Sequence, residues 1–207
     1  MAVEVPDVSE WRRADHQWRQ TSKGDWFDQS GQSISEFPLG NYVQDVQIDR
    51  LGRVWASYFD QKGYGVPALV CFDENGIRSR RLQMMSDAYA LNAGSRFTYL
   101  LATQTLTSGE IDKDFGFKKR TTPIRGAHAV AVGRAVLFSR QYDEESGVAH
   151  LLRMSGASLV EHNIVQLERP DGRPLGEHAA FVGRGHLLCC FDNEQWLCAD
   201  IHAVLDA

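Results

Sequence analysis

Four glycines, each lying between two short apolar segments, recur along the chain about 40 to 50 residues apart. They are Gly52, Gly94, Gly133 and Gly183. A glycine in this setting indicates the tight turn of a β-hairpin, because glycine readily adopts the backbone angles that such turns need. A third strand and an outer partner can be drawn after most of these hairpins. Each repeat is therefore an antiparallel unit that must pack against its neighbours to bury both faces.

The repeat from Val43 to Gly76 has the clearest strand and turn pattern. Its predicted strands are Val43–Ile48, Arg53–Phe59 and Ala68–Phe72, with Ile77–Leu82 following at once. The intervening segments Asp49–Gly52 and Asp73–Gly76 place Asp, Asn and Gly where tight turns require them. This stretch predicts one complete four-stranded unit.

We find no segment of about ten or more residues with a convincing helical period, so the sequence predicts an all-β fold. A repeat of this length favours a β-propeller over a sandwich or a barrel. We predict a single domain, residues 1–207, folded as a small propeller of four to five four-stranded antiparallel blades. Its parts are an N-terminal part-blade with closure strands at 1–42, then blades at about 43–84, 85–123, 124–174 and 175–207. The last unit lacks an outer strand and the N-terminus has strands to spare. We therefore expect pairing between the N- and C-terminal strands to close the ring.

The residues from Asp49 to Trp55, with those from Ala68 to Gly76, resemble repeats of a known type. They are similar to the D-x-x-G-x-[IVL]-W … G-[LI]-x-x-[FY]-D-x-x-G blades of bacterial sensor and streptogramin-lyase-like propellers. The resemblance covers this one blade and implies the propeller fold. Lyases of that type use His and Glu with a metal, but no local motif in this sequence maps onto theirs. Fold resemblance alone carries little about activity.

The formal net charge of −5 argues against nucleic acid as the main partner, because nucleic-acid binding favours strongly basic surfaces. The N-terminus shows neither a basic region nor an apolar core of the secretory type, and no apolar run approaches the length that spans a bilayer. We therefore expect a cytoplasmic protein without a membrane partner. The cysteines are Cys71, Cys189, Cys190 and Cys198, in apolar strand patterns without zinc-site spacing. We expect them to be buried, reduced thiols.

A polar residue precedes the apolar part of the innermost strand in each of four repeats. These residues are Asp45, Asp87, His128 and His178. Equivalent positions of a propeller converge on the central channel, and oxygen and nitrogen ligands of this kind suit a divalent metal. The alternative is that these side chains hydrogen-bond the backbone of neighbouring blades and hold the ring together. We expect no other cofactor.

The loops on one face of the predicted propeller are the second candidate site. They span residues 60–67, 103–109, 141–149 and 192–195. The first carries aromatic residues and the third carries acidic ones; the six candidates are Tyr58, Phe59, Tyr64, Asp143, Glu144 and Glu145. Aromatic anchors beside an acidic rim suit a basic protein partner. The alternative is that these are ordinary surface loops.

Two functions follow from these candidates. The first, which we favour, is a non-catalytic binding protein, a scaffold or an inhibitor of the immunity type, that holds a basic partner protein on this loop face. The second is a metal-dependent hydrolase or lyase with its site in the central channel. No catalytic motif decides for the second, so the sequence favours a binding protein over an enzyme.

Overall fold

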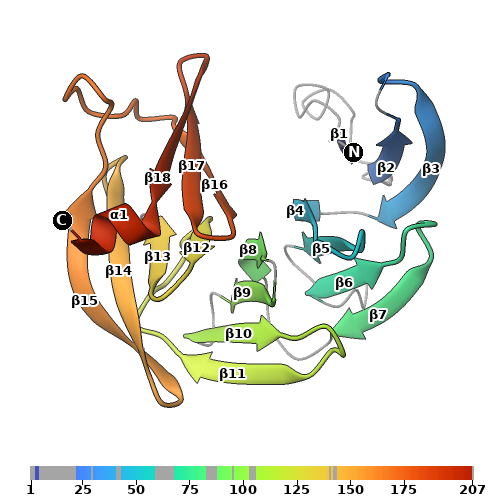
Figure 1. The fold of residues 1–207 in the computed structure, drawn as a ribbon, viewed down its shortest axis with the longest axis horizontal. Helices are drawn as coiled ribbons and strands as arrows, with labels where there is room; N and C mark the ends of the chain where they lie inside the picture. Colours follow the sequence, from blue (N-terminus) through green and yellow to red (C-terminus); the bar gives the residue numbers. More distant parts are fainter. Residues whose placement is uncertain are drawn as a thin grey trace, which may run out of the picture.

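The chain forms successive antiparallel sheets that follow one another round an arc (Figure 1). This computed structural model describes residues 3–4, 22–28, 30–40, 43–58, 68–82, 88–94, 96–102, 106–139, 141 and 144–206. Within these ranges every element is a strand except one short C-terminal helix, so the all-β prediction is confirmed. No helix in this part of the chain is both long and apolar enough to cross a membrane.

The best-preserved repeat forms a four-stranded sheet in the predicted order. Its strands are β4 (Val43–Ile48), β5 (Val54–Tyr58), β6 (Leu69–Phe72) and β7 (Arg78–Leu82). The Asp49 carboxylate accepts hydrogen bonds from the Leu51 and Arg53 N–H groups, and from the indole of Trp55 at 3.0 Å. Gly52 has φ 77°. One aspartate thus fixes both the turn and the tryptophan that packs under it, which explains the D-x-x-G-x-x-W pattern.

The next two repeats share one eight-stranded sheet. The first supplies β8 (Ala88–Ala93), β9 (Thr98–Ala102), β10 (Thr107–Ile111) and β11 (Phe117–Thr121). The second supplies β12 (Val130–Val132), β13 (Val136–Ser139), β14 (Val148–Ser155) and β15 (Ser158–Gln166). Their outer strands are joined by a single parallel pair, Thr121 with Ser158. The end strands β8 and β12 also contact one another, so this sheet nearly closes on itself.

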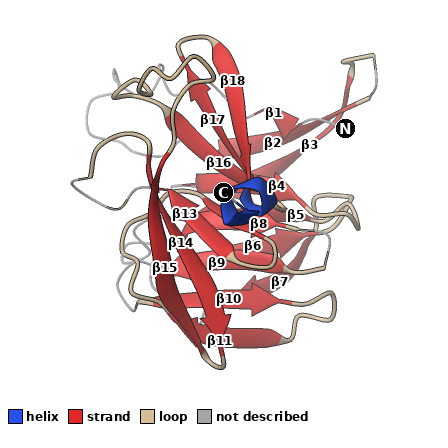
Figure 2. Ribbon diagram, turned by 60° about the vertical axis from the view of Figure 1, so that its left-hand side comes forward, coloured by secondary structure: helices blue, strands red, loops and turns tan. Residues whose placement is uncertain are grey.

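Both ends of the chain form three-stranded sheets. The N-terminal sheet holds β1 (Val3–Glu4), β2 (Ser22–Phe27) and β3 (Ser33–Gly40), and the C-terminal sheet holds β16 (Ala180–Arg184), β17 (Leu187–Asp192) and β18 (Gln195–Asp200). Helix α1 (Ile201–Asp206) follows β18 directly (Figure 2). The two sheets are separate, so no ladder joins the chain ends within the described residues.

The core lies between successive sheets. Trp26 and Phe37 of the N-terminal sheet pack against Val54 and Phe72 of the β4–β7 sheet. Similar clusters join the β4–β7 sheet to β8–β10, β8–β9 to β12–β14, and β12–β14 to β16–β18 and α1. Neighbouring repeats thus bury each other's apolar faces, as the repeat pattern predicted.

The prediction of four reduced cysteines is wrong for one pair. Cys189 and Cys198 are direct partners across β17 and β18, with Cα atoms 4.0 Å apart, and they form a disulfide. A close cross-strand pair brings two side chains of one face together, which apolar patterning alone did not reveal. Cys71 and Cys190 are free and buried, as expected.

Candidate functional site

The four innermost strands, β4, β8, β12 and β16, meet at the centre of the arc, where contacts join β8 to each of the other three and β12 to β16. The Gln47 side chain of β4 is buried there. Its amide nitrogen donates to the carbonyl oxygens of Leu91 at 2.8 Å and Gly183 at 3.1 Å, and its amide oxygen accepts the Ala93 N–H at 2.8 Å. One side chain therefore ties β4 to both β8 and β16.

Asn92 makes the matching connection from β8. Its amide nitrogen donates to Val130 O at 2.6 Å and Gly185 O at 2.9 Å, while its amide oxygen accepts the Gly185 N–H at 2.9 Å. Asn92 is 1% exposed and Gln47 is 4% exposed. Two buried amides thus occupy the place where the sequence predicted a channel lined by Asp and His.

The strand registers do not place the Asp and His residues of the predicted metal set at equivalent positions. Gln47 pairs with Trp55, Asn92 with Tyr99 and Ala131 with Leu137, each one pair before the hairpin turn. Two residues earlier, Asp45 of β4 therefore corresponds to Ala90 of β8 and Ala129 before β12. Alignment on Gly52 and Gly94 matched Asp45 with Asp87 because it assumed that both glycines hold the same place in their turns, and His128 was included as the polar residue before the next apolar strand. Asp45 and His128 are therefore not equivalent in the strand registers, and the metal site in the channel stays a prediction.

The other predicted metal ligands are Asp87, His128 and His178. Asp87 is outside the described residues. The His128 ring is exposed and lies against Tyr89, with ring centroids 5.2 Å apart, and His178 is exposed before β16. Among the described residues, no three His, Cys, Asp or Glu side chains are grouped to hold a metal ion.

Asp45 itself is electrostatically unusual. Burial beside the inner strands raises the pKa of Asp45 to about 6, although hydrogen bonds from Gln47 and the Val46 N–H and the charge of Arg184 oppose the shift. The folded protein therefore holds this proton more tightly than the unfolded chain does. The contribution of Asp45 to the free energy of unfolding should therefore fall by about 3 kcal/mol as the pH rises from about 4 to about 6.

We expect Asp45→Asn to remove this pH dependence and to be more stable than the parent protein above pH 6, because the asparagine has no charge to desolvate. Urea unfolding at several pH values measures the difference. Asp28→Asn is the matched control. The Ser30 hydroxyl lowers the pKa of Asp28, so this variant should be less stable than the parent by a constant amount above about pH 4, and the difference should shrink as the pH falls below about 4. Parallel stability profiles for the parent and Asp45→Asn would contradict the assignment.

The predicted loop face contains residues with structural roles. Tyr58 is 2% exposed and its hydroxyl donates to the Leu39 carbonyl oxygen, so it belongs to the core and the prediction of a surface contact is corrected. Phe59, Tyr64 and Asp143 lie outside the described residues, as do residues 60–67 and 103–105 of the loops. Residues 192–195 form a tight turn, with positive φ at Asn193 and Glu194. Glu145 is exposed.

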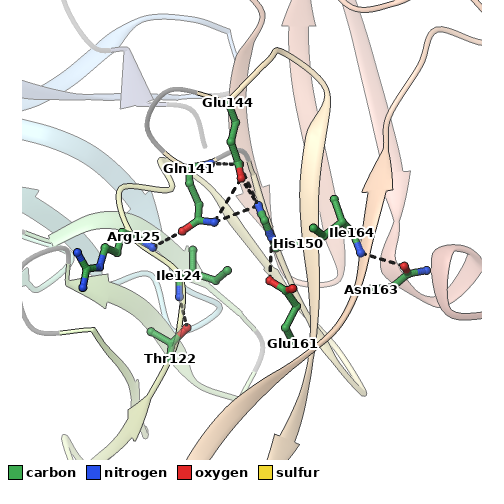
Figure 3. A network of polar contacts seen from close by, with 9 residues as sticks. All are labelled: Thr122, Ile124, Arg125, Gln141, Glu144, His150, Glu161, Asn163 and Ile164. Carbon is green, nitrogen blue, oxygen red and sulfur yellow. Dashed lines mark hydrogen bonds and ion pairs between the residues drawn. The ribbon is translucent and has the colours of Figure 1, made fainter.

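Glu144 points inward to a buried histidine (Figure 3). His150 of β14 is 2% exposed; its Nε2 lies 2.9 Å from Glu144 and its Nδ1 lies 3.1 Å from Glu161 of β15. Burial alone would raise the pKa of Glu144, but the Gln141 N–H and the His150 ring outweigh burial, so this pKa is lowered. Both ring nitrogens of His150 therefore face a carboxylate. The network joins Gln141 and Glu144 to β14 and β15, and it engages the Glu144 carboxylate that was expected to face a partner.

A cleft lies on the face opposite the predicted loop face. We call it the turn face. It consists of the hairpin turns that follow β4, β8, β12 and β16, with the β10–β11 and β14–β15 turns outside them. One cavity of about 330 Å³ lies between the β4–β5, β8–β9 and β10–β11 turns. A second, of about 420 Å³, lies between β8–β11 and the turns of β12–β13 and β16–β17. Arg96 and Phe97, in the β8–β9 turn, line both cavities.

Ion pairs and ring contacts hold the walls of this cleft. Arg53 pairs with Asp49 at 2.7 Å and donates to Lys113 O at 2.9 Å, which joins the β4–β5 and β10–β11 turns. Phe115 has φ 65°, a backbone conformation that non-glycine residues seldom adopt. Its ring lies 5.0 Å from the Arg53 guanidinium. In the second cavity, the buried Arg120 pairs with Glu110 at 2.9 Å. The walls are therefore largely preformed.

An exposed histidine and a half-buried one close the far end of the second cavity. His186 of the β16–β17 turn stacks against His202 of α1, with ring centroids 5.5 Å apart. Gly133 makes room for the helix, because a Cβ there would lie 2.9 Å from Ile201 and 3.0 Å from the His202 ring. Sequence reasoning missed Arg96, Phe97 and His186, since a turn residue shows no period that marks it as part of a cleft.

Comparison with solved structures shows that the fold is similar to that of streptogramin B lyase and other β-propeller proteins. A streptogramin B lyase structure matches with a TM-score of 0.50 and 17% identity, over 86% of this chain and 61% of the lyase chain. A chain of a mitotic checkpoint complex matches at 0.57 and 9%, over 87% and 60%. Glutaminyl cyclase from Myxococcus xanthus matches at 0.50 and 10%, over 86% and 84%.

The chain thus spans about three fifths of the length of the first two of these proteins. No protein-family model matches the sequence, and no curated protein matches it. At these identities the likeness concerns the fold and carries no activity across to this chain. The resemblance read from one blade of the sequence is confirmed at the level of the fold.

Proposed function

We propose that this chain is a non-catalytic binding domain that holds a partner protein in the cleft of its turn face. The observation that carries the proposal is the combination of a preformed cleft with exposed apolar side chains at its edges. Leu51 is 53% exposed, Phe97 46% and Met154 37%, and each lines one or both cavities. Apolar anchors within a polar rim are typical of protein-binding surfaces.

We assign the contact to the turn face and not to the loop face expected from the sequence. Tyr58 and Glu144, two of the expected contact residues, are engaged inside the protein. The turn face instead offers side chains that are exposed and rigidly supported, because the Arg53–Asp49 and Arg120–Glu110 pairs hold the neighbouring turns. A preformed surface binds at lower entropic cost than a mobile one.

We also infer that the sheets form a propeller of five units, of which the first and last have three strands. The sequential meanders and the meeting of β4, β8, β12 and β16 at one centre support this count. Closure of the ring through the chain ends remains part of the proposal. It would have to involve residues outside the described ranges, because β1–β3 and β16–β18 are separate sheets.

The binding proposal is tested by Phe97→Ser. The parent chain, immobilised, should retain a partner from extracts of cells that express it, and Phe97→Ser should retain at least about tenfold less, because a central apolar anchor is lost. Ile164→Ser is the matched control, since Ile164 is equally apolar and 56% exposed but lies on β15, far from the cleft. Calorimetry with the purified partner then compares the three chains. Equal affinity for Phe97→Ser and the parent would refute the proposal.

A further inference from the structure

We infer that the segment of the partner that enters the cleft is acidic, with a carboxylate held by Arg96. This inference rests on the proposed function and specifies its ligand. It reverses the expectation of a basic partner, which followed from Glu144 and its neighbours on the loop face. The reasons are the charge balance of the cleft walls and the position of one arginine between the two cavities.

Most of the carboxylates that line the cleft already form ion pairs with cationic side chains of the same chain. Asp49 is paired with Arg53, Glu110 with Arg120 and Asp114 with Lys113, at distances between 2.7 and 2.9 Å. The remaining one, Asp112, accepts the Asp114 and Gly116 N–H groups at 2.9 and 2.7 Å and so is used by the β10–β11 turn. A basic ligand would therefore find no carboxylate that is not already engaged.

The cleft is lined by more cationic side chains than these internal ion pairs use. Arg50 and Arg96 line the cleft, are exposed, and form no ion pair with any described residue. The Arg and Lys side chains that line the two cavities, Arg50, Arg53, Arg96, Lys113 and Arg120, outnumber the four carboxylates. The net charge of the side chains that line the cleft is positive, although the whole chain carries a net charge of −5. Such a patch attracts an anionic segment and repels a cationic one.

Arg96 occupies the position in the cleft where it can bind a ligand carboxylate most effectively. It borders both cavities, so an extended segment that fills them must pass its guanidinium. A guanidinium binds a carboxylate through two parallel N–H···O hydrogen bonds, which fix orientation as well as charge. Phe97 beside it supplies an apolar surface, and Gly94 leaves the backbone of the turn uncovered. The site therefore suits an acidic residue next to an apolar one, in an extended peptide.

The test uses three synthetic hexapeptides with blocked ends: Glu-Glu-Leu-Phe-Glu-Glu, its Gln-for-Glu counterpart and its Lys-for-Glu counterpart. We expect the acidic peptide to bind at least about tenfold more tightly than the neutral one, and the basic peptide not to bind, at about 50 mM salt. Arg96→Glu should weaken binding of the acidic peptide by about tenfold or more. Lys119→Glu, on the exposed surface of β11, is the control of equal charge change and should alter it less than twofold.

Three results would overturn the inference: equal affinity for the acidic and neutral peptides, no effect of Arg96→Glu, or no binding of the acidic peptide. A single-stranded thymidine oligonucleotide of the same charge covers the other anionic class. If it bound through Arg96 more tightly than the acidic peptide, a phosphate backbone would be the ligand and the inference would be wrong. Failure of the binding proposal is separate, since it is measured by Phe97→Ser and the partner.

Discussion

Gly183→Ala is expected to destabilise the protein by about 3 to 5 kcal/mol, a large part of the stability of a domain of this size. A Cβ at Gly183 would lie 1.8 Å from the carbonyl oxygen of Val130 and 2.5 Å from its carbonyl carbon. Both contacts are with backbone atoms of β12, so no side-chain rotation relieves them. β16 would have to move away from β12, and the Val132 N–H bond to Gly185 O, at 2.7 Å, would be lost with the packing.

Urea unfolding followed by tryptophan fluorescence measures this effect. The control is Gly156→Ala, in the β14–β15 turn, where a Cβ meets nothing within 4 Å and the cost is that of a positive φ, 58°. We expect a loss of about 1 kcal/mol there. If the two variants lost equal stability, the close approach of β16 to β12 would not be what requires glycine at position 183.

Gln47→Leu is expected to cost about 3 to 5 kcal/mol, because leucine has a similar volume but neither donates nor accepts. The substitution leaves Leu91 O, Gly183 O and the Ala93 N–H without their partner in a buried site. Each unsatisfied buried group costs about 1 to 3 kcal/mol. The loss should appear as a lower midpoint of urea unfolding, with cooperative unfolding retained.

Gln44→Leu provides the matched comparison on the same strand. Gln44 is exposed on β4, and we expect the change to alter stability by less than about 0.5 kcal/mol. If Gln47→Leu were as mild as Gln44→Leu, the central amides would contribute little, and packing of the inner strands alone would hold the arc together.

The local structure of the first complete repeat could be predicted because its signals are local. The Asp49 and Asp73 turns were placed correctly, since each aspartate accepts N–H groups two and four residues later in the chain. The strands between the turns followed from alternation and apolar content. The short helix after Asp200 carried no such signal, because a helix of one or two turns shows no period that can be distinguished from a strand.

The centre of the molecule could not be predicted in the same way. Its contents depend on the register of strands from different repeats, and the glycine spacing that revealed the repeats does not give that register. Gly52 lies four residues after the end of β4, whereas Gly94 directly follows the end of β8, so alignment on these glycines matched Asp45 with Asp87 although the strand register matches it with Ala90. Gln47 and Asn92 are polar residues within apolar strands. That departure from pattern was the one signal in the sequence that pointed to them.

The identity of the residues that line the cleft depends on contacts between turns that are even further apart in the sequence. Arg96 and Phe97 occupy a turn of ordinary composition, and only the approach of the β4–β5, β10–β11 and β16–β17 turns makes them the walls of cavities. Likewise, the acidic sequence around Glu144 gave a correct expectation of charge but not of direction. His150, six residues later, turns that carboxylate inward.

The hydrogen bonds of the Gln47 and Asn92 side-chain amides also affect how one face of the molecule can influence the other. In the described part of the chain, these bonds link the inner strands at the centre, between the turn face and the loop face. Whatever occupies one of them can influence the other only by displacing strands, at the cost of hydrogen bonds that hold the inner strands together.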